Sequence, residues 1–417
     1  MNLMVEKSEL SDSLVAFPSK FFTQIACAAA IVSGKKNVIK DPLASKETFL
    51  MLKIAEGLGG EARRGGGKWV IFSPQEIRPA SGSVNVKNSG SAAALLAGLL
   101  SAAKNPILLT GGQSLCARPM APLLKSLQAL GVDIHSVKES DAPPFIIFNS
   151  APAGGVVKLS RWESRYFGAL ALVSPLTSKG AKIYVPSSAS LLKPTLNFIK
   201  AAGIKPRKFR GGVEIPPRDY RPFTYEVPQD ISFTAPFFIS QVLSGKEVKI
   251  KGKIQLPRDH IFLSLLKKFG IGWELKKYGV RIWRERLRGA KVDISEVPEL
   301  FPIFAVVACF ASGRSEITGA EEARKMKSDR ISTVTVSLKK MGAQILEQSD
   351  GIVAQGPSEL RGASVECSGD PAVAAALMIA VMLAEGKTSI ENGLDALNLS
   401  YPRVMTTLRD LGAKAGF

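Results

Sequence analysis

Cationic side chains stand where predicted helices begin in two parts of this 417-residue sequence. Lys20 opens a predicted helix at residues 20–33, and Arg118 follows the glycine pair Gly111-Gly112 and precedes a proline. The positive end of a helix dipole opposes a lysine in the first turn, and glycines let the backbone approach a ligand closely. Both patterns indicate a bound anion, although an ordinary helix-start lysine and a solvated surface arginine would give the same sequence.

The net charge of +19 also favours an anionic partner, which would be nucleic acid, a membrane surface or a phosphorylated small molecule. Lysines and arginines are scattered, without a long run or an aromatic-interleaved basic motif, so we expect no nucleic-acid partner. The four cysteines lack metal-ligand spacing and there are only two histidines. We therefore expect neither a metal nor a cofactor.

The ends and apolar runs of the sequence bear on its location. The start, MNLMVEKSEL, has no basic segment followed by an apolar one, so it does not resemble a signal peptide. The longest apolar run, near residues 371–384, is too short to span a bilayer. We expect a cytoplasmic protein with free thiols, no membrane partner and a monomeric state.

The elements that must position these residues repeat along the chain. A glycine follows the last apolar residue of a predicted helix about every 70 residues, and such a glycine is the usual left-handed helix end. The six glycines are Gly59, Gly131, Gly203, Gly270, Gly342 and Gly412. The sequence therefore predicts six copies of one structural unit.

Each predicted unit opens with a helix that is apolar on nearly every side, as in SAAALLAGLLSAA. Helices of this kind are buried all round, and the six candidates lie at residues 20–33, 91–103, 164–176, 231–243, 300–312 and 371–385. A short β-prone strand follows each one, at residues 37–39, 106–109, 181–185, 247–250, 315–318 and 388–391. A second, more amphipathic helix and one or two strands complete the unit.

Two architectures fit such units. One is a doubly wound α/β sheet, and the other is a set of compact βαβαββ units, each packed around its own buried helix. The even number of units favours the second architecture, with three units in each of two domains. The charged, proline-bearing stretch 205–228 is the clearest break in the chain, and we expect a crossover between the halves near its end.

Several segments resemble the enolpyruvyl transferase family, and the likeness covers nearly the whole chain. LTGGQSLCARPMAPLLKSLQALG resembles the family's arginine-proline loop. VPELFPIFAVVACFASGRSEITGAEEARKMKSDRI resembles its carboxylate segment and its lysine-glutamate-serine-aspartate-arginine segment, and LLKPTLNFIKAAG and LNLSYPRVMTTLRDLG match in pattern. Within the family, the resemblance is greatest to the enzymes that act on 3-phosphoshikimate.

The resemblance implies an α/β fold of two domains, each with three βαβαββ units around buried helices. Domain one is expected at residues 1–17 and 229–417, and domain two at residues 18–228. The substrate cleft is expected between the two domains.

The resemblance also implies a reaction. The carboxyvinyl (enolpyruvyl) group of phosphoenolpyruvate moves to a phosphorylated cyclic alcohol, which is 3-phosphoshikimate by the resemblance, and phosphate is released. Two polyanionic substrates require cations and helix N-termini to hold them. A tetrahedral intermediate requires one group that takes a proton from the hydroxyl and another that protonates the enol carbon.

By position, the resemblance assigns catalytic roles to Glu299 and Lys20. It implies that substrates are bound by Lys20, Asn88, Gly90, Arg118, Ser164, Arg165 and Arg330. Arg118 and Arg330 match arginines that hold phosphoenolpyruvate, and Ser164 matches a serine that holds the shikimate phosphate. A helix-start glutamate stabilised by the dipole is the alternative for Glu299, and a local ion pair with Asp329 is the alternative for Arg330.

Other positions depart from the family pattern. Arg165 replaces a glutamine, Met326 a lysine and Lys327 a glutamate, and further polar or charged residues are replaced by Ile25, Leu192, Ala372 and Leu399. These departures leave an alternative open, a divergent homologue with low or no synthase activity that binds another anionic metabolite or a protein partner. Neighbouring helical side chains point about 100° apart, so a rigid helix would turn Lys325 and Lys327 away from the position of Met326.

Overall fold

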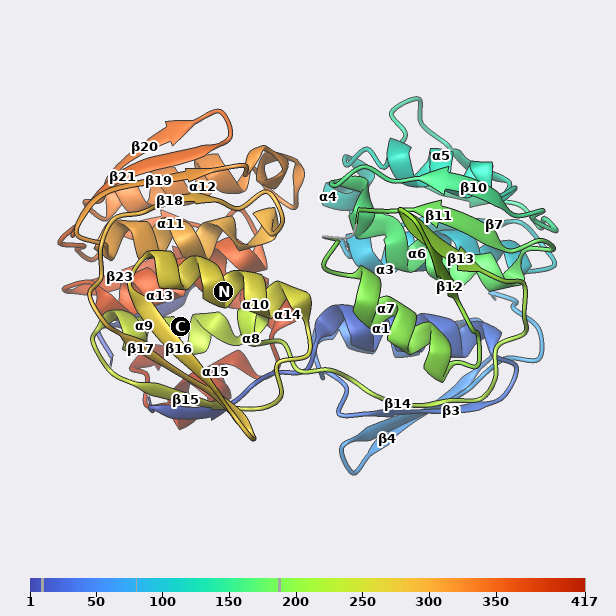
Figure 1. Cartoon of the computed structure of the whole chain (residues 1–417), viewed down its shortest axis with the longest axis horizontal. Helices are drawn as coiled ribbons and strands as arrows, with labels where there is room; N and C mark the ends of the chain where they lie inside the picture. Colours follow the sequence, from blue (N-terminus) through green and yellow to red (C-terminus); the bar gives the residue numbers. More distant parts are fainter. Residues whose placement is uncertain (9–10, 80, 187–188, 417) are drawn as a thin grey trace. The chain divides into compact units, whose positions relative to one another are not determined.

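The computed structural model describes residues 1–8, 11–79, 81–186 and 189–416. The chain forms two compact units, shown in Figure 1. Unit 1 comprises Met1–Phe17 and Gln229–Phe417, and unit 2 comprises Pro18–Pro228. The N-terminal strands, dark blue in Figure 1, therefore belong to the same unit as the yellow-to-red part of the chain.

The described part of unit 2 contains three four-stranded sheets with the orders β14-β3-β5-β4, β6-β7-β9-β8 and β10-β11-β13-β12. The strands are β3 (Lys36–Lys40), β4 (Glu61–Gly65), β5 (Lys68–Phe72), β6 (Ser83–Asn85), β7 (Ile107–Thr110), β8 (Ile134–Ser136), β9 (Phe145–Ile147), β10 (Gly155–Lys158), β11 (Ala181–Tyr184), β12 (Arg207–Phe209), β13 (Gly212–Ile215) and β14 (Thr224–Glu226).

The helices of unit 2 lie between these strands. They are α1 (Lys20–Val32), α2 (Lys46–Gly57), α3 (Gly90–Leu99), η1 (Leu100–Ala102), α4 (Gln113–Cys116), α5 (Ala121–Ala129), η2 (Glu163–Tyr166), α6 (Phe167–Val173), η3 (Ser174–Leu176) and α7 (Leu192–Ala201), where η marks a 3₁₀ helix.

The described part of unit 1 repeats this plan with the sheet orders β22-β23-β1-β24, β16-β17-β15-β2 and β18-β19-β21-β20. The strands are β1 (Leu3–Glu6), β2 (Ser13–Val15), β15 (Val248–Lys251), β16 (Ile271–Lys276), β17 (Gly279–Arg284), β18 (Lys291–Asp293), β19 (Gly313–Thr318), β20 (Gln344–Gln348), β21 (Gly351–Gly356), β22 (Ser364–Glu366), β23 (Lys387–Glu391) and β24 (Ala415–Gly416).

The helices of unit 1 are α8 (Ile231–Thr234), η4 (Ala235–Phe237), α9 (Ile239–Leu243), α10 (Pro257–Lys268), η5 (Pro298–Leu300), α11 (Phe301–Phe310), η6 (Glu321–Lys325), α12 (Arg330–Lys340), α13 (Pro371–Leu383), α14 (Gly393–Ser400) and α15 (Val404–Asp410). Within the described ranges, neither unit has a helix that is long and apolar enough to cross a membrane.

One pairing pattern recurs in all six sheets. An edge strand pairs in parallel with its neighbour, as β6 does with β7, and the remaining pairs are antiparallel. In unit 1 the N-terminal residues complete two sheets, because β2 pairs with β15 and β1 lies between β23 and β24. The predicted compact βαβαββ units are therefore confirmed, and a single doubly wound sheet is excluded.

The predicted buried helices form two groups, α1 with α3 and α6 in unit 2 and α9 with α11 and α13 in unit 1. Two of them are less regular than expected. Residues 231–243 form α8, η4 and α9, and residues 163–176 begin and end as 3₁₀ helix. Pro236 and Pro175 lie in the 3₁₀ segments η4 and η3, where a missing N–H interrupts the α-helical pattern.

The six helix-ending glycines behave as predicted. All six have positive φ values, between 79° and 98°. A side chain is disfavoured in this left-handed region, so glycine there lets the chain leave the second helix of each unit and enter the next strand.

Candidate active site

Lys20 begins α1, after Ser19, whose hydroxyl accepts the N–H of Phe22 at 3.5 Å. Nζ of Lys20 lies 2.7 Å from Oε2 of Glu47, in the first turn of α2. The two side chains are only 29% and 12% exposed, so the pair is shielded from water. Glu47 is thus an anion within the protein that offsets the unfavourable dipole at Lys20.

Gln24 connects this ion pair to the start of α3. Its Nε2 donates to the main-chain oxygen of Glu47 at 3.5 Å and to Oγ of Ser89 at 3.3 Å, and its Oε1 accepts from Ser91 at 2.6 Å. Ser89 is the N-cap of α3. Sequence analysis missed Gln24, although a polar residue on an otherwise apolar helix was a usable signal.

The loop after β7 is held against the turn that precedes α3. Oδ1 of Asn88 accepts the N–H of Leu115 at 3.3 Å, and the N–H of Gly112 donates to the main-chain oxygen of Lys87 at 2.7 Å. A Cβ on Gly112 would lie 2.5 Å from Oδ1 of Asn88, and one on Gly111 would collide with the Lys87 oxygen. The glycine pair is therefore required for this close approach.

Arg118 follows that loop and lies over the first turn of α3. A Cβ on Gly90 would be 2.9 Å from Nη1 of Arg118, so the guanidinium packs against a residue without a side chain. The structure thus brings Asn88, Gly90 and Arg118 together at one helix N-terminus, with Lys20 linked to it through Gln24.

Arg165 lies in η2 and stacks on two aromatic rings. Its guanidinium carbon is 3.7 Å from the ring centroid of Trp162 and 4.6 Å from that of Tyr166, and Nη2 donates to the Tyr166 hydroxyl at 2.6 Å. Burial raises the pKa of Tyr166, while the positive charges of Arg165 and Arg118 oppose that rise. Stacking and the hydrogen bond to the phenol therefore hold Arg165 in a defined orientation.

Ser164, on the same turn as Arg165, is half-buried. Its hydroxyl donates to the main-chain oxygen of Arg161 at 2.6 Å. The hydroxyl oxygen can still accept a hydrogen bond, and rotation of the hydroxyl would let it donate a hydrogen bond to a ligand instead. The hydrogen bond to Arg161 therefore orients the Ser164 hydroxyl on the same turn as Arg165.

In unit 1, Glu299 lies in η5, before the buried helix α11. Its Oε1 lies 3.4 Å from Nη1 of Arg258, and Nη2 of Arg258 donates to Asp230, a nearly buried carboxylate. Arg258 was not predicted from the sequence. It connects a half-buried glutamate to a carboxylate in the interior of the unit.

Asp259 lies beside this network and is fully buried. Its carboxylate accepts the N–H groups of Ile231 at 3.0 Å and Ser232 at 2.9 Å. Burial, reinforced by the charge of Asp230, raises the pKa of Asp259 to about 7, although Arg258 and the two N–H groups act in the opposite direction. Two acidic side chains therefore share the start of α8.

Arg330 begins α12 and is held by Asp370. Nε and Nη2 lie 2.8 and 3.1 Å from the two carboxylate oxygens, a bidentate pair. Nη1 donates to the main-chain oxygen of Glu299 at 3.2 Å and lies 3.0 Å from Sδ of Met326. The predicted residues Glu299 and Arg330 are therefore adjacent, and Asp370, which sequence analysis missed, fixes the second of them.

The segment between η6 and α12 is not a continuous helix. η6 ends at Lys325, Met326 has a φ of −83° and a ψ of −146°, and residues 326–329 lie outside both helices. The argument that a rigid helix would turn Lys325 and Lys327 away from the position of Met326 therefore does not apply, because the backbone leaves helical geometry at Met326.

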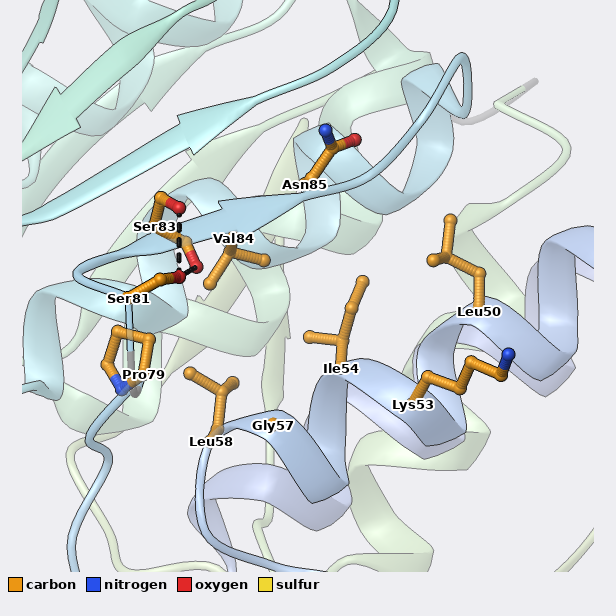
Figure 2. A pocket seen from close by; sticks show the side chains of 10 residues that line it. All are labelled: Leu50, Lys53, Ile54, Gly57, Leu58, Pro79, Ser81, Ser83, Val84 and Asn85. Atoms are coloured by element: carbon orange, nitrogen blue, oxygen red, sulfur yellow. Dashed lines mark hydrogen bonds between the residues drawn. The ribbon is translucent and has the colours of Figure 1, made fainter.

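The described residues contain no group of three or more histidine, cysteine, aspartate or glutamate side chains that could hold a metal ion. A hollow of about 280 Å³ lies between α2 and the chain around β6. Figure 2 shows Ile54 of α2 and Leu58, the residue after this helix, facing Val84 of β6 across it. None of the predicted site residues lines this mainly apolar hollow.

Comparison with known proteins identifies relatives over the full chain. Residues 6–408 match the family model for EPSP synthase (3-phosphoshikimate 1-carboxyvinyltransferase). Curated proteins named 3-phosphoshikimate 1-carboxyvinyltransferase are 30% identical in Methanocorpusculum labreanum and 29% identical in Methanococcus maripaludis, and each alignment covers 99% of both chains.

Solved structures share the fold. EPSP synthase from Acinetobacter baumannii is 21% identical with a TM-score of 0.81, and the match covers 100% of this chain and 99% of that one. The enolpyruvyl transferase NikO from Streptomyces tendae is 16% identical with a TM-score of 0.81, covering 100% and 98% of the two chains.

Proposed function

The chain belongs to the EPSP synthase family, and we propose that it transfers the carboxyvinyl group of phosphoenolpyruvate to 3-phosphoshikimate with release of phosphate. Relatives named for this activity align with 99% of the chain. That full-length match favours the transferase over a homologue that only binds another anionic metabolite or a protein partner. The structural observation that carries the proposal is a pair of oriented cations in unit 2: Arg118 packs over Gly90 at the N-terminus of α3, and Arg165 is held by stacking on Trp162 and by its hydrogen bond to Tyr166.

Phosphate and carboxylate groups require such a cluster. Arg118 presents its guanidinium over the N-terminus of α3, where unsatisfied N–H groups and the dipole also favour an anion. Arg165 adds a second planar cation, and each charge-assisted hydrogen bond contributes about 1.5–3 kcal/mol. We assign these two residues, with Asn88, Gly90 and Ser164, to substrate binding.

The reaction also needs proton transfers. The acceptor hydroxyl adds to C2 of phosphoenolpyruvate while C3 gains a proton, and loss of phosphate with return of that C3 proton restores the double bond. Glu299 is the group proposed to take the hydroxyl proton, and Lys20 the cationic group proposed to protonate C3. Arg330, held by Asp370 beside Glu299, is proposed to bind phosphoenolpyruvate.

Phosphate release by the purified protein tests the proposal. Phosphate should appear only when phosphoenolpyruvate and 3-phosphoshikimate are both present, and proton NMR should show a new enol ether in equal amount. Each substrate alone is the control. Absence of phosphate release, or release that does not depend on the acceptor, would show that the proposal is wrong.

A further inference from the structure

Arg258 is the second residue of α10 and contacts two carboxylates with two nitrogens of one guanidinium. Nη2 donates to Asp230, and Nη1 donates to Oε1 of Glu299 at 3.4 Å. The Arg258 side chain is 24% exposed and that of Glu299 is 34% exposed, so water only partly screens their contact. Because the guanidinium is planar and rigid, holding one carboxylate also fixes the direction in which the other is bound.

The Asp230 carboxylate is the fixed point of this arrangement. Its side chain is only 3% exposed, and Oδ1 accepts the N–H of Phe233 at 2.9 Å and the Ser232 hydroxyl at 3.0 Å. Burial would lower the pKa of Arg258, but negative charges, first that of Asp230 and then that of Glu299, outweigh it and raise that pKa. Arg258 is therefore a cation tied to the interior of the unit.

Glu299 is also held at its main chain. Its main-chain oxygen accepts a hydrogen bond from Nη1 of Arg330 at 3.2 Å, and Arg330 is itself fixed by the bidentate pair with Asp370. The side chain of Glu299 therefore has an arginine contact at each end. A glutamate has several rotatable bonds, and without the contact at its carboxylate it would sample several rotamers.

We propose that Arg258 is a positioning residue, which holds the Glu299 carboxylate in the orientation in which it takes the proton of the acceptor hydroxyl. This inference rests on the proposed function. A carboxylate has two acceptor oxygens, so Oε2 receives the proton while Oε1 keeps its contact with Arg258. Orientation of this kind matters for the rate, because a displacement of about 1 Å can slow a reaction by about a hundredfold.

Steady-state phosphate release by the full chain tests this role. Arg258→Met keeps the apolar stem and removes the guanidinium. It should lower kcat by about tenfold to a hundredfold and leave KM for both substrates within about threefold, because Arg258 acts on Glu299 and not on a substrate. Arg281→Met is the matched control, since Arg281 is an arginine of the same unit that pairs with Glu247, and it should leave kcat within about twofold of the wild type.

A double-mutant cycle separates positioning from general damage to the structure. If Arg258 acts through Glu299, adding Arg258→Met to Glu299→Gln should lower kcat by less than about a further twofold. A merely structural effect would lower kcat by the same factor in both backgrounds. That additive result, or a wild-type kcat in a folded Arg258→Met protein, would overturn the inference.

Removal of the Arg258 cation leaves the carboxylate of Asp230 buried without its partner charge, which is strongly destabilising. If Arg258→Met does not fold, the same substitution is made together with Asp230→Asn. The amide keeps an N-cap for α8 and removes the buried charge. Comparison of this double variant with Asp230→Asn alone should show the same tenfold to hundredfold loss of kcat, about the scale given above, and an equal kcat in the two would overturn the inference.

Failure of this inference is distinguishable from failure of the proposed function. A wild-type protein that releases no phosphate would overturn both. Acceptor-dependent phosphate release by the wild type, with kcat unaffected by Arg258→Met or lowered equally in both backgrounds, would overturn the positioning role alone.

Discussion

Arg118 shows how single residues create the anion site in unit 2. Its guanidinium packs over Gly90, and the loop that carries it is pinned by Asn88. An anion bound at this place would interact favourably both with the guanidinium and with the N-terminus of α3.

Arg118→Met should weaken phosphoenolpyruvate binding by about tenfold or more, because it removes a charged donor and keeps the apolar stem. Binding can be measured by calorimetric titration. Arg63→Met is the matched control, since Arg63 is an exposed arginine of the same unit that pairs with Glu61. Unchanged affinity in Arg118→Met would show that the proposed site is wrong.

Glu299→Gln should lower turnover by about a hundredfold or more, the scale of one acid–base group. The amide keeps the size of the side chain but does not take the hydroxyl proton. Steady-state phosphate release measures the effect, and Glu274→Gln, on the exposed pair with Lys276, should leave turnover unchanged. A rate near the wild-type value would assign proton removal to another group.

The buried Asp259 should make stability depend on pH. Its folded-state pKa of about 7 lies above the ordinary value of 3.8, so between these values the native state holds a proton that the unfolded chain releases. The contribution of Asp259 to the free energy of unfolding should therefore decrease as pH rises from about 4 to 7, by at most about 1.4 kcal/mol per pH unit.

Asp259→Asn should remove this component, because an amide does not titrate. Urea denaturation at several pH values measures the slope, and Asp12→Asn, an exposed change in the same unit, should leave it as in the wild type. An identical pH dependence in wild type and Asp259→Asn would contradict the assignment.

At the scale of elements, a small residue allows close packing of the buried helices in unit 2. Gly98 of α3 faces α5 and α6, and a Cβ there would lie 2.9 Å from Cδ2 of Leu127 and 2.9 Å from Cβ of Val173. The Val173 Cβ is fixed by its own backbone, so the helices would have to separate. Small residues in these helices therefore set how closely their axes approach.

Gly98→Ala should destabilise the protein although alanine favours helix. The propensity gain is about 1 kcal/mol, whereas overpacking costs about 1–3 kcal/mol, and the rigid neighbours favour the upper part of that range. Gly57→Ala, at the exposed end of α2 with no atom near its Cβ, should instead stabilise by about 0.5–1 kcal/mol. Urea midpoints for both variants provide the measurement, and a more stable Gly98→Ala protein would refute the packing argument.

At the scale of the whole molecule, the two units differ in continuity. Unit 2 is one segment, Pro18–Pro228, and each described strand of its sheets has its partners within that segment. Unit 1 needs residues from both ends of the chain. β1 is an inner strand with Leu3 and Val5 buried, and β2 completes a second sheet.

A fragment of residues 18–228 should therefore fold cooperatively by itself, whereas a fragment of residues 229–417 should not. The second fragment lacks β1, the inner strand between β23 and β24, so the backbone N–H and C=O groups of both strands that face β1 lose their partners. Circular dichroism during urea denaturation distinguishes the outcomes, and supplying residues 1–17 is the control that should restore folding. Cooperative unfolding of 229–417 alone would show that β1 is dispensable.

The sequence by itself determined the repeat, the fold class and the family. These features are local or periodic: glycine ends a helix wherever its neighbours form one, and a helix apolar on all sides is buried in any compact arrangement. The irregular starts and ends of the buried helices were not predictable from apolarity alone, because apolarity does not distinguish α from 3₁₀ geometry.

Only the tertiary structure decided which charges meet. Arg330 and Asp370 are 40 residues apart in the chain, and neither local sequence predicts that the two side chains form an ion pair. Likewise, Lys325 and Lys327 are equivalent in the sequence, but Lys325 ends η6 with an exposed side chain, whereas Lys327 lies in the non-helical segment that follows and its Nζ is buried. Local patterns specify elements, whereas the direction of a side chain and its electrostatic environment depend on segments that only folding brings into contact.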